Sequence, residues 1–270
     1  MKNRIAFPGV RFGGTSWVVH GGFAENMRRL SEDVSDMQFV LFDNAYGSNL
    51  PSKEEVRALA DLCLELDMSC TVHFHNDVCM SLKPKERVRC EDSCLRTLEL
   101  FDEINPRAWI LHLCGEQYGT RPSADMERWL ELTARSVERI ASASRDRSRI
   151  CAETLDYDFS LVWPVVAETG ISTCIDIGHL IKYGHSAIKQ LETYMESVRA
   201  LHIHGVMPDG TDHKDMSFFD KKLLTQILKM LEMDGREHVM TIEVFGEDYW
   251  RSVNILREFA HNIGREGYNA

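Results

Sequence analysis

Residue types that bind metal ions stand at the ends of six successive apolar segments of this 270-residue chain. Each segment is short and rich in Val, Ile, Leu or Phe, which is typical of a buried strand, and helical sequence follows each one. The residues at these ends are His73, His112, Glu153, Asp176, His202 together with His204, and Glu243. Imidazoles and carboxylates gathered at one end of parallel strands predict a divalent-metal centre.

The alternation within each segment indicates which way these side chains point. Residues two apart lie on the same face of a strand, so Cys151 shares a face with Glu153 and Cys174 with Asp176. Small side chains deeper in the barrel, with ligand side chains nearer its mouth, are the arrangement expected for a barrel interior. Burying three carboxylates without a cation would be very unfavourable or would force protonation. We therefore expect a cation cage made of Glu153, Asp176, His202 and Glu243.

Two more histidines follow strand ends in the sequence. In Asp176-Ile177-Gly178-His179, the glycine is expected to let the chain turn sharply so that His179 reaches back to the same centre. His213 follows Asp212 in a loop, where it would hold a second metal ion or contact an anionic substrate. A solvated loop histidine remains the alternative for His213. The other histidines lie away from strand ends and are expected at the surface: His20, His185, His238 and His261.

Strand-like and helix-like segments alternate along the whole chain. The expected strands are 10–17, 37–42, 69–75, 108–113, 149–153, 171–176, 199–204 and 238–244. Ser52 with Glu55 predicts a capping box at a helix start, and Gly170 predicts a helix end. Eight strand–helix units over residues 1–270 predict one (β/α)8 TIM-barrel domain. The competing fold, a doubly wound open sheet, would not bring six strand ends to one centre.

Composition narrows the function classes. A net charge of −11 without a Lys/Arg cluster argues against nucleic acid as a partner, because nucleic-acid affinity depends on neutralising phosphates. No stretch approaches the roughly 18 apolar residues that span a bilayer, and the N-terminus lacks the apolar core of a signal peptide. We expect a cytoplasmic protein that acts on a small molecule and has no membrane partner. The sequence leaves the oligomeric state open.

Longer motifs carry a family resemblance. The segments ILH, ETLD, DIGH, LHIHG and IEVFGED resemble the xylose isomerase-like TIM-barrel superfamily, which includes endonuclease IV-type enzymes and sugar epimerases. A closer similarity, to the cobamide-remodelling phosphodiesterase (CbiR) family, is carried by GTSW, FVLFDN followed by SNLPS, CAETLDYDF, CIDIGHL and TIEVFGEDYW. It implies hydrolysis of the phosphodiester in the nucleotide loop of cobamides, with cobinamide phosphate as product. His75 departs from the family pattern, in which proline is expected.

The resemblance also implies roles for single residues. The implied metal ligands are His73, His112, Glu153, Asp176, His179, His202, His213 and Glu243, with His202 preferred to His204. Glu153 would act as a bridging ligand or base, and His112 or His213 would stabilise charge on the leaving oxygen. Such mixed nitrogen and oxygen ligands suit zinc, manganese or iron, and the sequence allows one to three ions. The expected pocket residues are His75, His204, Tyr157 and Phe245.

A cobamide is large, so loop aromatics should contact it. The candidates are Trp17, Tyr46, Tyr118, Tyr157, Phe245, Tyr249 and Trp250.

Three other functions compete with this interpretation. A metal-dependent sugar or sugar-phosphate isomerase or epimerase needs one metal and two carboxylates that move a proton, which Glu153 and Glu243 could supply. Against it, His73 and His112 supply more ligands than one metal requires, and the loop just after the seventh strand's histidines contains no Arg. An abasic-site endonuclease is disfavoured by the acidic charge. A non-catalytic corrinoid- or sugar-binding barrel would not need a complete metal cage.

Overall fold

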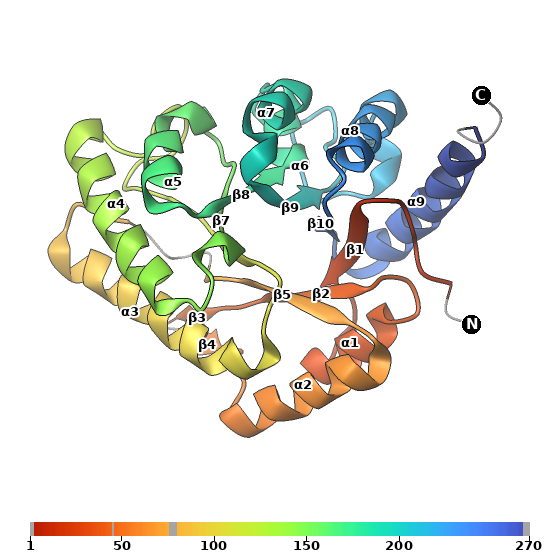
Figure 1. Cartoon of the computed structure of the whole chain (residues 1–270), viewed down its shortest axis with the longest axis horizontal. Helices are drawn as coiled ribbons and strands as arrows, with labels where there is room; N and C mark the ends of the chain where they lie inside the picture. Colours follow the sequence, from red (N-terminus) through yellow and green to blue (C-terminus); the bar gives the residue numbers. More distant parts are fainter. Residues whose placement is uncertain (1–2, 45, 76–79, 267–270) are drawn as a thin grey trace.

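Eight parallel strands close into a barrel in the computed structural model, which describes residues 3–44, 46–75 and 80–266 (Figure 1). The order around the barrel is β1-β10-β9-β8-β7-β6-β5-β2. The strands are β1 (Val10–Thr15), β2 (Asp36–Val40), β5 (Ser69–His73), β6 (Trp109–Leu111), β7 (Ile150–Glu153), β8 (Ser172–Asp176), β9 (Val198–Ile203) and β10 (His238–Ile242). The (β/α)8 fold predicted from the sequence is confirmed, and it gathers the C-terminal strand ends at one mouth.

Helices surround the barrel and cover its outer face (Figure 1). They are α1 (Phe23–Leu30), α2 (Lys53–Leu66), α3 (Pro84–Phe101), α4 (Met126–Ala143), α5 (Trp163–Thr169), α6 (Ile177–Lys182), α7 (Ala187–Tyr194), α8 (Lys221–Asp234) and α9 (Gly246–Glu266). Two helices, α6 and α7, follow β8, and a hairpin of β3 (Asp43–Asn44) and β4 (Gly47–Ser48) precedes α2. The sequence did not predict these two elaborations of the regular repeat.

Local sequence signals set helix ends as expected. Ser52 Oγ accepts a hydrogen bond from the Glu55 backbone N–H at 3.2 Å, and Glu55 Oε2 accepts one from the Ser52 N–H at 2.7 Å. This capping box satisfies two backbone donors that the first turn of α2 leaves without a partner. Gly170 ends α5 with φ 66°, a left-handed conformation that glycine adopts without steric cost.

The barrel interior forms distinct layers. A small apolar cluster of buried residues lies inside the barrel, made of Ala108, Ile110, Cys151, Cys174 and Ala200. The expected inward direction of Cys151 and Cys174 is thus confirmed. Between β8 and β9 the register shifts at Thr173/Cys174, so that Asp176 pairs with His202. The ligand candidates therefore stand one layer above the small apolar groups.

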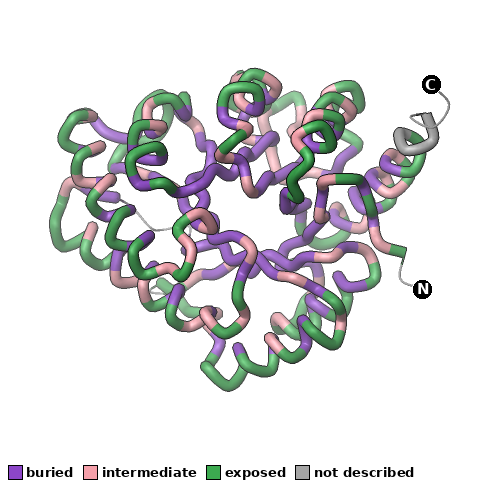
Figure 2. Tube along the Cα trace, viewed as in Figure 1, coloured by how far each residue is buried: buried purple, intermediate pink, exposed green. Residues whose placement is uncertain are grey.

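The larger core lies between the strands and the helices, whose outer faces are exposed (Figure 2). Several strands end one or two residues earlier than the sequence predicted, so His112, His204 and Glu243 lie just beyond β6, β9 and β10. Among the described residues, none of the helices combines the length and apolar composition that crossing a membrane requires.

Candidate metal centre

Four side chains from β7 to β10 meet at the barrel mouth. They are Glu153, Asp176, His202 and Glu243, with ligand atoms all within 4.8 Å of one another. His202 Nδ1 lies 3.2 Å from Glu153 Oε1, 3.3 Å from Glu243 Oε2 and 3.7 Å from Asp176 Oδ2. Asp176 Oδ2 is buried and accepts no hydrogen bond from the described residues. A buried carboxylate oxygen left in this way fits a cation that coordinates it. We call these four residues the carboxylate cage.

Gln38 on β2 orients His202 from across the barrel. Its amide nitrogen donates to Glu243 Oε1 at 3.0 Å, so its oxygen is left to accept from His202 Nε2 at 2.8 Å. With the Nε2 proton directed at Gln38, Nδ1 is the ring nitrogen that faces the carboxylates and can coordinate a metal once its own proton is displaced. Sequence reasoning missed Gln38. The signal was a polar residue inside the apolar run Met37–Leu41, on the same strand face as Asp36.

Glu153 also belongs to a second cluster, with His73 and His112. Its Oε2 lies 3.3 Å from His73 Nε2 and 3.0 Å from His112 Nε2, whereas its Oε1 faces the carboxylate cage. His73 Nδ1 lies 2.6 Å from the Phe74 carbonyl oxygen and donates to it, which presents Nε2 to Glu153. Glu153 is therefore the residue that joins the two clusters, one oxygen to each.

Three imidazoles form a third cluster, made of His179, His204 and His213. The His204 and His213 rings stack with centroids 4.2 Å apart, and His204 Nδ1 accepts the His213 backbone N–H at 3.0 Å. His213 has φ 52°, a left-handed conformation uncommon for a residue other than glycine. His213 Nδ1 lies 2.9 Å from the Glu243 carbonyl oxygen. Backbone contacts thus hold this loop histidine at the mouth.

The role predicted for Gly178 was wrong. The chain makes no special turn there, because α6 begins directly after β8 with Asp176 as its N-cap. Asp176 Oδ1 accepts the His179 N–H at 2.8 Å, which places His179 in the first turn and back over the cage. A Cβ at Gly178 would lie 2.1 Å from the His204 ring. The glycine is needed to make room for that imidazole.

The ionisation pattern of the mouth favours charged carboxylates. Burial on its own raises the pKa of Glu153, Asp176 and Glu243, but the neighbouring imidazoles outweigh it and hold each pKa below the usual value. The same carboxylates raise the pKa of His73, His179, His202 and His204, for His204 to about 9, against the effect of burial. Without a cation, these directions favour protonated imidazoles over protonated carboxyl groups, so neighbouring imidazoles offset the negative charge of the three buried carboxylates. A cation that binds here displaces those protons.

The other predicted site residues lie in different surroundings. His75 is 2% exposed, and its Nε2 lies 3.3 Å from Thr97 Oγ1 of α3, away from the clusters. Tyr157 is 3% exposed and donates its hydroxyl to the Leu113 carbonyl oxygen at 2.8 Å, so its ring offers no exposed surface to a substrate. Phe245 is 40% exposed and its ring centroid lies 5.7 Å from that of His213.

Two more expectations about exposure need correction. His238 was expected at the surface, but it is 1% exposed and its Nε2 lies 2.9 Å from Asp234 Oδ2, because it begins the buried strand β10. Tyr249, expected in a substrate loop, is fully buried on α9.

Comparison with known proteins shows the fold. No family model and no curated protein sequence matches the chain. Among solved structures, a D-tagatose 3-epimerase-like protein aligns with TM-score 0.73 at 15% identity, over 95% of this chain and 99% of that one. Endonuclease IV from Thermus thermophilus aligns with TM-score 0.70 at 14% identity, over 93% and 99%. A xylose isomerase domain-containing protein from Salmonella typhimurium aligns with TM-score 0.62 at 17% identity, over 96% and 97%.

These alignments show that the chain shares its (β/α)8 barrel fold with all three proteins. These neighbours include both sugar epimerases and a nuclease, and identities of this size carry no information about which reaction this chain performs.

Proposed function

We propose that this chain is a metal-dependent phosphodiesterase that hydrolyses the nucleotide-loop phosphodiester of a cobamide. One observation carries the proposal. Glu153 joins the carboxylate cage to the His73 and His112 cluster, beside a third cluster of imidazoles. Phosphodiester hydrolysis benefits from several cations, which stabilise the attacking and the leaving oxygen together. A proton transfer between sugar carbons has no need for so many ligands.

The donor set fits divalent cations of borderline softness. Its nitrogen and carboxylate oxygen atoms suit zinc, manganese or iron better than magnesium or calcium. Asp176 Oδ2, which accepts no hydrogen bond from the described residues, and the other buried carboxylate oxygens supply the negative charge that such ions compensate. A cation bound there lowers the pKa of a coordinated water and so makes hydroxide available at neutral pH.

The side chains of the site have separate roles in the proposed reaction. Both Glu153 oxygens face imidazoles, which favours the role of a bridging ligand over that of a base. Among the imidazoles of the three clusters, His213 has the most exposed side chain at 30%, and His112 and His179 follow at 15% each. His112 and His213 are thus accessible enough to reach a substrate. In the reaction, water oxygen bonds to phosphorus, the bond from phosphorus to the nucleoside oxygen breaks, and one of these imidazoles donates a proton to that oxygen.

Exposed aromatics support a large apolar substrate. Six stand on connections that follow the C-terminal ends of barrel strands: Trp17, Tyr46, Tyr118, Tyr183, Phe218 and Phe245. Tyr183 and Phe245 lie against the third cluster, with ring centroids 6.3 Å from His179 and 5.7 Å from His213. Such a rim suits the wide apolar faces of a corrinoid better than a single sugar ring.

A sugar or sugar-phosphate epimerase is the second candidate. The carboxylate cage alone provides one metal site with two carboxylates, Glu153 and Glu243, that could move a proton. Several solved structures that share the fold of this chain are also sugar epimerases, among them a D-psicose 3-epimerase from Clostridium cellulolyticum. His112 separates the two candidates, because only the hydrolysis proposal requires it.

The test is direct turnover. Metal-loaded protein is incubated with adenosylcobalamin, and cobinamide phosphate is sought by mass spectrometry, in parallel with a ketohexose panel and abasic-site DNA. We expect product from the cobamide, and a loss of about 100-fold or more in His112→Ala. Product from the sugars alone, with His112→Ala still active, would replace this proposal by the epimerase.

A further inference from the structure

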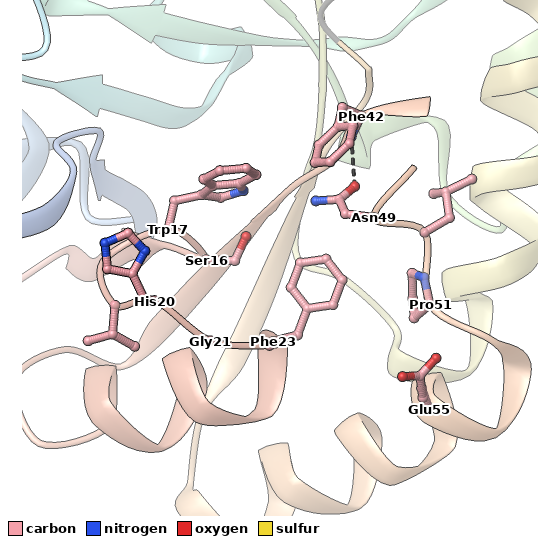
Figure 3. A pocket seen from close by; sticks show the side chains of 12 residues that line it. Ser16, Trp17, His20, Gly21, Phe23, Phe42, Asn49, Pro51 and Glu55 are labelled. Atoms are coloured by element: carbon pink, nitrogen blue, oxygen red, sulfur yellow. Dashed lines mark hydrogen bonds between the residues drawn. The ribbon is translucent and has the colours of Figure 1, made fainter. Parts of the chain in front are cut away.

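A cavity of about 430 Å³ opens between the connections that follow β1 and β2, on the mouth side of the barrel (Figure 3). Its walls come from the Ser16–Gly22 connection, the first residue of α1, and the segment that leads into α2. Figure 3 shows the rings of Trp17, Phe42 and Phe23 around this space, with Pro51 on the side of α2. The proposed chemical step does not use this cavity, although Trp17 also belongs to the exposed aromatics named above.

Aromatic rings form the main wall. Trp17 is 48% exposed, and its ring centroid lies 5.9 Å from that of Phe42 with the planes tilted by 57°. The Trp17 Nε1–H donates to the Val40 carbonyl oxygen at 3.3 Å, which fixes the indole while half of its surface stays uncovered. Phe23 is held from behind by an edge contact with Phe39, at 5.1 Å between centroids. The rings are thus placed before any ligand arrives.

Two polar side chains of the same wall, Asn49 and Glu55, already have partners, whereas His20 is an exposed imidazole of that wall. Asn49 Oδ1 accepts the Phe42 N–H at 2.8 Å, and its Nδ2 donates to the Val40 carbonyl oxygen at 2.9 Å. Glu55, the one carboxylate among the described lining residues, accepts the Ser52 N–H in the capping box. A charged ligand would gain few new hydrogen bonds here, whereas an apolar one would be removed from water.

The cavity adjoins the carboxylate cage through Ser16 and Gln38. The Ser16 N–H donates to the Gln38 carbonyl oxygen at 2.9 Å, and Ser16 Oγ accepts the Val40 N–H at 3.0 Å. The Gln38 side chain contacts His202 and Glu243 of the cage. One residue of β2 therefore separates the aromatic wall from the proposed reaction centre.

We propose that this cavity is a subsite for a flat, uncharged aromatic group of the substrate, a fused bicyclic ring carried next to the scissile phosphodiester. The volume lies near the lower end of the roughly 300–1,000 Å³ of ligand pockets, so it admits one ring system and excludes a macrocycle. Stacking and edge contacts with Trp17 and Phe42 hold the ring, and shape excludes bulkier groups. The position of this group next to a phosphodiester rests on the proposed function, whereas the affinity for the ring does not.

The experiment measures ring binding without turnover. Indole is titrated by calorimetry into full-length, metal-free protein, which prevents binding to a cation. Trp17→Ala should weaken the affinity by roughly 5- to 100-fold, the range seen when an aromatic stacking partner is removed. Trp17→Phe should fall between it and the wild type. The matched control is Trp163→Phe on α5, whose ring contacts Tyr194 instead, and it should bind indole as the wild type does.

The outcomes separate the two proposals. Equal indole affinity in Trp17→Ala and wild type, with both proteins folded by circular dichroism, would overturn the subsite. Binding of D-fructose in place of indole would do the same and would assign the cavity to sugars. If indole binding depends on Trp17 but the metal-loaded enzyme leaves cobamides intact, the subsite stands and the phosphodiesterase proposal fails. If both hold, Trp17→Ala should raise KM for the cobamide with little change in kcat.

Discussion

Two buried aspartates in the same barrel have opposite surroundings. Asp36 on β2 accepts hydrogen bonds from the Ser69 and Thr71 hydroxyls at 2.6 and 3.0 Å, and burial raises its pKa. Asp176 at the end of β8 has one oxygen without a hydrogen bond, and although burial alone raises its pKa, His179 and His204 hold it below the usual value. Neutral donors that satisfy a carboxylate stabilise the fold. A charged carboxylate that has one oxygen without a hydrogen bond can coordinate a cation through that oxygen.

The largest expected effect comes from exchanging the two aspartates for asparagine. Asp176→Asn removes a charged ligand, so metal content should fall and turnover should drop by at least about 100-fold, more than loss of an outer contact costs. Asp36→Asn retains an acceptor for the Ser69 and Thr71 hydroxyls, so it should keep the metal content and the turnover of the wild type. Its free energy of unfolding should fall by about 1 kcal/mol. Metal analysis and the turnover assay report the two effects. Equal metal loss in both variants would remove the distinction between the two sites.

Removing the metal should destabilise the protein, because the cation binds at the mouth of the folded barrel. A ligand present at 100 times its Kd stabilises a protein by about 2.7 kcal/mol, which corresponds to roughly 5–10 °C in Tm for a domain of this size. Calorimetric melting with and without a chelator should show this difference in the wild type and in Asp36→Asn. In Asp176→Asn the two melting curves should coincide, and a full shift there would show that the cation binds elsewhere.

Gln38 tests how His202 is oriented. Gln38→Ala removes the acceptor for His202 Nε2 and the donor to Glu243 without touching a ligand atom. Metal affinity, measured by competition with a chromophoric chelator, should fall by about 10- to 100-fold, as for other contacts behind a metal ligand. Gln226, an exposed glutamine of α8, provides a control whose change to Ala should leave the affinity unchanged. An unaltered metal affinity in Gln38→Ala would show that His202 is oriented without help from Gln38.

The smallest expected effect concerns His238, a buried histidine far from the mouth. Burial, more than any neighbour, lowers its pKa, so folding favours the neutral imidazole. The resulting stability is complete above the unfolded pKa of about 6.5 and is lost as pH falls toward the lowered folded value. His238→Gln should therefore melt with a weaker pH dependence below pH 7 than wild type, and parallel curves would refute this account.

The barrel and the strand-end ligands could be read from the sequence because they depend on short-range patterns. Alternation within a strand fixed the faces of Cys151 and Glu153, and parallel closure then gathered the strand ends. His75 and Tyr157 were misplaced because their side chains turn toward Thr97 and Leu113, contacts that no local pattern records. Gln38 was missed because a single amide in an apolar strand has no distinctive spacing.

The amino-acid order by itself determined that carboxylates and imidazoles end successive strands, since hydrophobic periodicity and chain connectivity are local properties. Only the tertiary structure decided which ligand atoms face one another. It placed His202 in the carboxylate cage and His204 in the imidazole cluster, and it divided the two Glu153 oxygens between two clusters. The reason is that a ring or carboxylate is oriented by partners distant in sequence, as Gln38 orients His202 across 164 positions of the chain.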